Sequence, residues 1–157
     1  MMAAQVYPGP VVRELRAADL EHVVRIDDQH TGQPKPGYWE RVLTGFIRRD
    51  DDRERVGLAA EVDGRMVGYL LGEVRAFEFG SEPCGWIFAV GVERDRLRGR
   101  VASSLLDEAG RRFKDSGVSR MRTMVRRNDV PVLSFFRANG FVGGEFVQLE
   151  LDLKGEA

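Results

Sequence analysis

Residues 85–92 read GWIFAVGV, residues 93–100 read ERDRLRGR, and residues 101–113 read VASSLLDEAGRRF. The first segment is an almost unbroken apolar run, which is typical of a strand buried on both faces of a sheet. The last segment places its apolar side chains on one helical face. The basic segment leads into the helix N-terminus, where free N–H groups and the positive end of the dipole favour anions. This order predicts a site for anionic groups.

The same stretch resembles the acetyl-CoA-binding core of the GCN5-related N-acetyltransferase (GNAT) superfamily. Its members carry a strand, a Gln/Arg-x-x-Gly-x-Gly/Ala loop and a helix. In the family the loop amides hold the pyrophosphate of coenzyme A, and the strand pairs with the pantetheine arm. Here the three motif places fall on Leu97, Arg100 and Ala102, of which only the last matches. Arg96 and Gly99 form a partial match that is shifted by one residue.

The composition is that of one soluble domain. The chain has 157 residues, of which 43% are hydrophobic and 31% charged, and its net charge is −1. This charge gives no general attraction to nucleic acid or anionic membranes. The single cysteine, Cys84, excludes an internal disulfide and a cysteine-built metal site. The sequence lacks an apolar run of membrane-spanning length and an apolar signal-peptide core, so we expect a cytoplasmic protein.

Strand and helix patterns alternate along the rest of the chain. Residues 1–10, with two prolines and a glycine, predict a flexible lead-in. The expected elements are, in order, a strand at 11–16, helices after Asp19 and around 39–47, a hairpin of 56–62 and 65–76 across Asp63-Gly64, the central strand and helix, a strand at 118–125, a helix from Asp129 to Ala138, and one or two strands within 141–153. Such an order predicts a mixed sheet with helices on both faces.

The order of elements also resembles the GNAT fold over nearly the whole chain. The helix that begins at Asp129 and ends at Gly140-Phe141 is similar to the last helix of the family. The resemblance implies an α/β (α+β) fold, the GNAT acyl-CoA N-acyltransferase fold, with a mixed sheet of six or seven strands and four helices. Residues 11–154 would form a single GNAT acetyltransferase domain.

The resemblance further implies which residues bind acetyl-CoA. Gly91, inside the central strand, suggests a bulge or a close backbone approach. In the family this strand splays from its neighbour, and the thioester enters the gap. The implied cofactor-binding residues are Val90, Gly91, Val92, Leu97, Arg98, Gly99, Arg100, Val101, Ala102, Ser103, Asp129 and Phe136.

Transfer of an acyl group to an amine needs a base for the ammonium proton and an acid for the leaving thiolate. Many relatives carry a tyrosine acid in the last helix, but that place is Phe136 here, and phenylalanine cannot donate a proton. The candidates for the two catalytic roles are Glu73, Glu82 and Tyr69. A surface charge or a packing residue is the commoner role for such side chains.

The resemblance predicts an acetyl-CoA-dependent N-acetyltransferase that uses no metal. A primary amine, on a protein N-terminus, a lysine or a small molecule, would attack the thioester directly. The alternative is a non-catalytic acyl-CoA-binding or regulatory module of the same fold, which Phe136 and the shifted glycine favour. A nucleic-acid-binding α/β domain rests on the arginine loop alone, and the net charge argues against it. We expect neither nucleic acid nor a membrane as partner; a homodimer is possible because relatives often dimerise.

Overall fold

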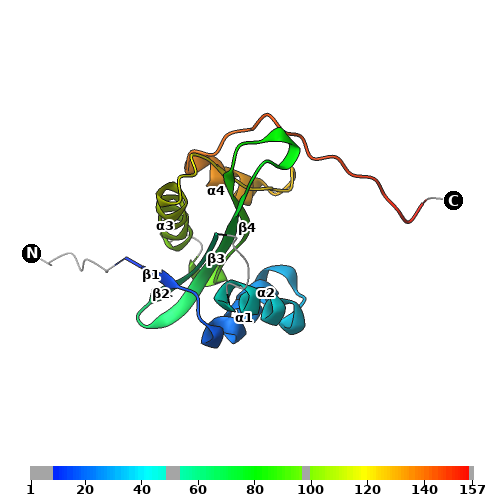
Figure 1. The fold of residues 1–157 in the computed structure, drawn as a ribbon. Helices are drawn as coiled ribbons and strands as arrows, with labels where there is room; N and C mark the ends of the chain where they lie inside the picture. The colour runs from blue at the N-terminus through cyan, green and yellow to red at the C-terminus, as the bar shows by residue number, and fades with distance from the viewer. Residues whose placement is uncertain (1–8, 49–53, 97–99, 156–157) are drawn as a thin grey trace, which may run out of the picture. The chain divides into compact units, whose positions relative to one another are not determined.

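The computed structural model describes residues 9–48, 54–96 and 100–155, so residues 1–8 of the expected lead-in lie outside it. The chain divides into two compact units, Met1–Met124 and Val125–Ala157, which are described separately. The first unit contains β1 (Val11–Glu14), α1 (Leu20–Thr31), α2 (Pro36–Arg48), β2 (Arg55–Val62), β3 (Arg65–Arg75), β4 (Cys84–Val92), α3 (Val101–Asp115) and β5 (Met121–Arg122) (Figure 1). No helix in the described ranges is both long enough and apolar enough to cross a bilayer.

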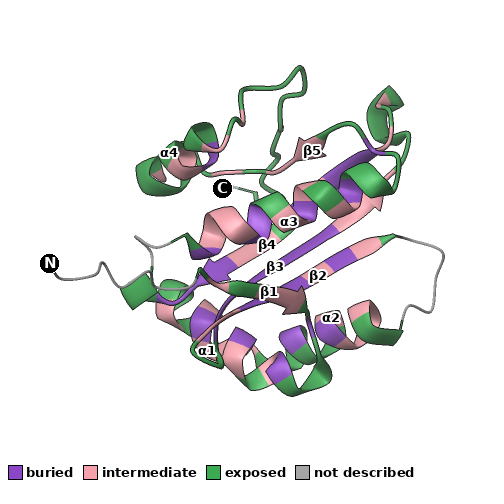
Figure 2. Cartoon of the chain, turned by 90° about the vertical axis from the view of Figure 1, so that its left-hand side faces the viewer, coloured by how far each residue is buried: buried purple, intermediate pink, exposed green. Residues whose placement is uncertain are grey.

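One sheet organises the first unit, and its strands follow the order β1-β2-β3-β4-β5. The first four strands are antiparallel neighbours, and β5 runs parallel to β4. Asp63 and Gly64 form the turn between β2 and β3 with positive φ angles of 52° and 75°. These angles suit the tight hairpin that the Asp-Gly pair predicts. Helices α1 and α2 cover one face of the sheet and α3 covers the other (Figures 1 and 2).

The described residues form five strands, fewer than the six or seven expected. β5 holds two residues of the strand predicted at 118–125. Residues 142–153, which belong to the last predicted strands, form no strand, and the alternating side chains of Val147, Leu149 and Leu151 are 73%, 87% and 82% exposed. An alternating pattern determines which side chains share a face, but a strand forms only beside a hydrogen-bonding partner.

The second unit contains one described helix, α4 (Val130–Ala138). Asp129 Oδ1 accepts a hydrogen bond from the Val132 N–H at 3.3 Å, so Asp129 caps this helix as the sequence predicts. Phe136 is buried and packs edge-to-face against Phe135 and Phe141, with ring centroids 5.2 Å and 5.1 Å away. Within this unit, Phe136 is therefore an aromatic packing residue.

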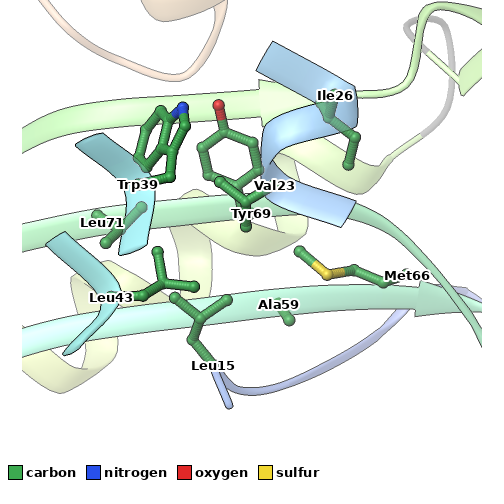
Figure 3. Packing of buried hydrophobic residues seen from close by; sticks show 9 residues of the cluster. All are labelled: Leu15, Val23, Ile26, Trp39, Leu43, Ala59, Met66, Tyr69 and Leu71. Carbon is green, nitrogen blue, oxygen red and sulfur yellow. The ribbon is translucent and has the colours of Figure 1, made fainter. Parts of the chain in front are cut away.

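A hydrophobic cluster joins α1 and α2 to the sheet. Figure 3 shows its members, which are Leu15, Val23, Ile26, Trp39, Leu43, Ala59, Met66, Tyr69 and Leu71. Val23 and Ile26 come from the buried face of α1, and Trp39 and Leu43 from that of α2. The helical spacing of these apolar residues along the sequence thus becomes one packed layer.

On the opposite face, small residues let α3 approach the sheet closely. A Cβ atom on Gly85 of β4 would lie 2.6 Å from the ring of Phe113, and one on Gly68 of β3 would lie 2.8 Å from Val101 Cγ1. Phe113 is 1% exposed and Val101 is 3% exposed. These glycines therefore leave the space into which two apolar side chains of α3 pack.

Glu93, directly after β4, is a buried carboxylate that two arginines neutralise. It accepts hydrogen bonds from Arg25 of α1 and, at 2.8 Å, from Arg65 Nη2 at the start of β3. Burial raises the pKa of Glu93, but the two guanidinium groups outweigh this effect and bring its pKa below the ordinary value. The ion pairs join α1, β3 and the end of β4.

We expect Gly85→Ala to destabilise the protein because the new methyl group overlaps the Phe113 ring. The melting temperature should fall by about 2–10 °C, since overpacking typically costs about 1–3 kcal/mol. Gly37→Ala is the matched control, because its nearest contact would be an Arg41 side-chain nitrogen at 3.8 Å. Differential scanning calorimetry measures both variants. Equal melting temperatures for the two would contradict the close approach of α3.

We expect Glu93→Gln to lower stability at neutral pH, by about 1.5–3 kcal/mol, because a charged hydrogen-bond acceptor is lost. The native pKa of Glu93 lies below its unfolded value, so the carboxylate stabilises the fold above the unfolded pKa. This stabilisation disappears as the pH falls through the native pKa. Urea unfolding at neutral and acidic pH should therefore show a difference that shrinks on acidification. A difference independent of pH, or one no larger than for the exposed-residue control Asp115→Asn, would refute this role.

Candidate functional site

A bulge interrupts β4 at Phe88. In the register of β3 and β4, Leu71 lies opposite Ala89 and Gly72 lies opposite Ile87, so Phe88 is an extra residue on β4. A bulge bends the strand and shifts the alternation of its main-chain groups by one residue. The set of main-chain groups that face away from β3 therefore shifts by one residue where the strand passes Phe88.

The sequence suggests a bulge or a close backbone approach at Gly91, but the structure places the bulge at Phe88 and packs the Tyr69 side chain against Gly91. Gly91 lies opposite Tyr69 of β3, and a Cβ atom on Gly91 would lie 2.5 Å from carbon atoms of the Tyr69 ring. The phenol ring therefore crosses β4 at the place where no side chain projects. Gly91 is required here by the position of Tyr69.

Among the described residues, only the beginning of β4 has a strand on its second side. β5 pairs with β4 at Gly85 and Trp86, and the Thr123 hydroxyl donates to the Ile87 carbonyl at 3.0 Å. Beyond Ile87 the described sheet places no strand on this side of β4. We call this part of β4, residues 88–92, the open edge.

The main-chain groups of Val90 and Val92 face the open edge. The Glu93 N–H donates to Val67 O of β3 at 2.8 Å, so the alternation turns Val92 and Val90 to the other side. His30 Nε2 lies 2.6 Å from Val92 O. A carbonyl only accepts, so His30 donates this hydrogen bond. Val92 O is thus occupied by α1, whereas Val90 presents its main chain where β4 has no neighbouring strand.

The last turns of α1 also hold the start of the basic loop. Gln29 Oε1 accepts a hydrogen bond from the Arg94 main-chain N–H at 3.1 Å. Arg94 and Arg96 form a short 3₁₀ turn with exposed side chains. The predicted cofactor-binding residues Leu97, Arg98 and Gly99 lie outside the described residues.

The N-terminus of α3 receives no side-chain cap among the described residues. Arg100 occupies the capping position, and a guanidinium group has no hydrogen-bond acceptor. No acidic side chain lies in the first turn. Val101 is buried, whereas Ala102 and Ser103 are half-buried. The first N–H groups of α3 thus remain suited to an anion, as the sequence predicts.

A pocket of about 460 Å³ lies at the open edge, on the face that α1 and α2 cover. Its lining residues are Asp27, Lys35, Tyr38, Trp39, Tyr69, Phe88, Ala89 and Val90. Three of the aromatic rings are in contact, because Tyr38 packs edge-on against Trp39 at 5.0 Å and Trp39 against Tyr69 at 5.5 Å. A smaller hollow, of about 320 Å³, lies between α2 and strands β1 and β2 and does not include β4.

Polar groups of this pocket converge on Asp27. Its Oδ2 accepts a hydrogen bond from Trp39 Nε1 at 3.0 Å and forms an ion pair with Lys35 Nζ at 2.8 Å, and its side chain is 12% exposed. In Figure 3 the indole nitrogen of Trp39 and the hydroxyl of Tyr69 point to the same side of the cluster. Burial, together with the charge of Asp27, raises the pKa of Tyr69 well above its usual range. Tyr69 therefore keeps its proton at neutral pH.

The structure brings one of the three predicted catalytic residues to this pocket. Tyr69 lines it, but Glu73 lies opposite Trp86 and faces Arg75 Nε at 3.4 Å, and Glu82 is exposed in the loop before β4. Neither glutamate lines the pocket. Asp129 and Phe136 belong to the second unit. The roles of all these residues stay predictions.

Sequence reasoning missed Asp27 and Lys35. Asp27 lies in the second half of α1, and Lys35 directly precedes α2. A carboxylate toward a helix C-terminus and an ammonium at a helix N-terminus both oppose the helix dipole. Two charges placed against the helix dipoles, one before the loop between α1 and α2 and one at the end of that loop, are the signal that could have identified the pair.

Comparisons with known proteins agree with this geometry. The family described as "Acetyltransferase (GNAT) family" matches residues 18–141. Mycothiol acetyltransferase from Saccharomonospora viridis is 27% identical over 93 residues, which are 57% of this chain and 30% of that protein. The chain therefore corresponds to less than a third of the length of this relative.

Solved structures of acetyltransferases share the fold. Aminoglycoside N-acetyltransferase AAC(6')-Iy in complex with CoA superposes with a TM-score of 0.75 at 18% identity, over 94% of this chain and 99% of that one. AAC(6')-IG from Acinetobacter haemolyticus gives 0.76 at 16% identity, over 90% and 97%. Ribosomal-protein-alanine N-acetyltransferase from Brucella melitensis biovar Abortus 2308 gives 0.74 at 14% identity, over 93% and 100%. The expected fold class is confirmed, and the chain belongs to the acetyltransferase (GNAT) family.

Proposed function

We propose that this protein is an acetyl-CoA-dependent N-acetyltransferase that transfers an acetyl group to a primary amine by direct attack. The observation that carries the proposal is the open edge of β4 beside the aromatic pocket. There, main-chain groups of Val90 lie next to a protonated Tyr69 and a carboxylate, Asp27. The pantetheine arm of acetyl-CoA, with its amides and thioester, would meet a proton donor, Tyr69, at this place. Asp27 would pair there with the ammonium group of the acceptor.

In this proposal the chain binds acetyl-CoA mainly through its backbone. The main-chain groups of Val90 and the Val92 N–H pair with the amide groups of the pantetheine arm, as an added strand would pair with a free sheet edge. The N–H groups of Arg100, Val101, Ala102 and Ser103, with the loop residues 97–99, hold the pyrophosphate at the start of α3. The arginines before α3 add charge-assisted contacts to phosphate oxygens.

The pocket side chains carry the chemistry in this proposal. Asp27 and the rings of Tyr38 and Trp39 bind the cationic acceptor, because a carboxylate and aromatic faces both attract an ammonium group. The Val90 N–H polarises the thioester carbonyl. Tyr69, which lines the pocket together with Val90, gives its proton to the leaving thiolate.

The acceptor class is a primary amine on a small molecule or on a protein. Related folds include aminoglycoside acetyltransferases and a ribosomal-protein-alanine N-acetyltransferase, so both kinds of acceptor occur among them. The buried carboxylate of Asp27 favours acceptors that arrive as cations. The second candidate function is a non-catalytic acyl-CoA-binding module, which the phenylalanine at position 136 favours.

One experiment separates the two functions. Acetyl-CoA should raise the melting temperature under both, by about 2.7 kcal/mol of stabilisation at a hundredfold excess over Kd. Only the enzyme should release free thiol from acetyl-CoA when it is offered a panel of polyamines, amino-sugars and peptides. A thermal shift without thiol release across the panel supports the module. The absence of a thermal shift overturns both readings.

We expect Tyr69→Phe to reduce kcat for thiol release by about 10²–10⁴-fold, because the variant lacks the proton donor. KM for acetyl-CoA should change little, since no contact of the backbone edge is altered. Tyr38→Phe is the matched control: it removes a hydroxyl from the same pocket, on a side chain that is 42% exposed. Steady-state kinetics measure both. Equal effects of the two substitutions would remove Tyr69 from the mechanism.

A further inference from the structure

We infer that Lys35 is an acceptor within the same chain: the protein acetylates its own Lys35, and the neutralised side chain releases Asp27 for an external ammonium group. This inference rests on the proposed function. It concerns a modification site that also controls access to the acceptor pocket. The chemistry of the pocket, the backbone at residues 34–36 and the charge balance each support it.

Lys35 places a primary amine in the pocket where the proposed acceptor binds. Its Nζ lies 2.8 Å from Asp27 Oδ2, and Lys35 lines the same pocket as Tyr69 and Val90. The side chain therefore occupies the position that an external cationic acceptor would need. It is itself an amine of the class that the proposed reaction consumes.

The backbone around Lys35 is held by its neighbours. Gly32 ends α1 with a φ of 67°, and Pro34 and Pro36 flank Lys35 on either side. A residue before proline is restricted to extended conformations. The Trp39 N–H also donates to Lys35 O at 3.0 Å, which ties the residue to the first turn of α2. The amine is therefore delivered from a restrained segment.

Charge explains why acetylation would change the pocket. Lys35 directly precedes α2, at the helix end where the dipole disfavours a cation, and its ammonium group pairs with the Asp27 carboxylate. Acetylation removes the positive charge. Asp27 would then keep its hydrogen bond from the indole N–H of Trp39, and it could pair with the ammonium group of another amine.

The transfer step balances without a further reactant. The Lys35 ammonium loses one proton to Asp27 Oδ2, which passes it to water. The free amine then attacks the carbonyl carbon of acetyl-CoA, so that an N–C bond forms, the C–S bond breaks and the nitrogen loses its second proton to water. The leaving thiolate takes a proton from Tyr69, which recovers one from water. The products are an acetamide on Lys35, free coenzyme A and a released proton.

The composition makes the modification easy to locate. Of the 24 lysines and arginines in the sequence, only Lys35, Lys114 and Lys154 are lysines. Lys114 is exposed and does not line the pocket, and Lys154 is exposed in the second unit, so both report spontaneous acetylation by the reagent. The two residues serve as internal controls in every sample.

The test incubates the full chain with acetyl-CoA and no external amine, and then measures each lysine by peptide mass spectrometry. We expect Lys35 to be acetylated at least tenfold faster than Lys114 and Lys154. The reaction within one chain should be first order, with a rate constant independent of protein concentration, and should release one equivalent of thiol. Tyr69→Phe should slow the modification of Lys35 only. Similar rates at the three lysines would overturn the inference.

A second pair of variants tests the effect on the pocket. Lys35→Arg keeps a cation beside Asp27 but cannot accept an acetyl group, whereas Lys35→Gln resembles the neutral acetylated side chain. We expect the KM for a cationic acceptor to be about three- to tenfold lower in Lys35→Gln than in Lys35→Arg, because one like charge is removed. Matching melting temperatures would show that both variants fold. Equal KM values would overturn the release of Asp27.

The outcomes also separate this inference from the proposed function. If an external amine releases thiol while Lys35 stays unmodified, self-acetylation is wrong and the transferase stands. If neither an external amine nor Lys35 is acetylated while acetyl-CoA still raises the melting temperature, both the transferase and the self-acetylation fail. The acyl-CoA-binding module then remains.

Discussion

The part of β4 that has no neighbouring strand in the described sheet, the open edge at residues 88–92, is the constraint on which the rest of the site depends. Main-chain N–H and C=O groups need partners, and a strand inside a sheet normally finds them on both sides. Here β5 pairs with Gly85 and Trp86 alone, and the bulge at Phe88 changes which groups face outward. The result is a short length of β4 that could accept an extended ligand. The pocket and the start of α3 gain their proposed roles from their relation to this edge.

Helix α1 stabilises the end of this strand through three polar contacts of different kinds. Arg25 neutralises buried Glu93, Gln29 accepts from the Arg94 main chain, and His30 bonds to the Val92 carbonyl. Each contact joins one helix to consecutive residues at the end of β4. Because α1 also contributes Asp27 to the pocket, one helix both contacts the end of the strand and supplies the ammonium partner.

Much of the fold could be predicted because its signals are local. The Asp63-Gly64 turn, the apolar face of α2 and the cap at Asp129 each depend on residues close together in sequence, and all three are present. The last strands could not be predicted in this way. Alternation within 142–153 describes two faces, but pairing requires a partner that the pattern does not name. The bulge at Phe88 likewise carries no local signal, since it is defined by the register against β3.

By itself the sequence determined the order of strands and helices as far as α4 and the resemblance to acetyltransferases, since these follow from periodicity and short motifs. Only the tertiary structure decided which side chains meet. Tyr69 crosses β4 above Gly91, and Asp27 pairs with Lys35 across the loop between α1 and α2. The physical reason is that strand pairing and helix packing bring together groups from separate elements, and distances between elements are not encoded in any single segment.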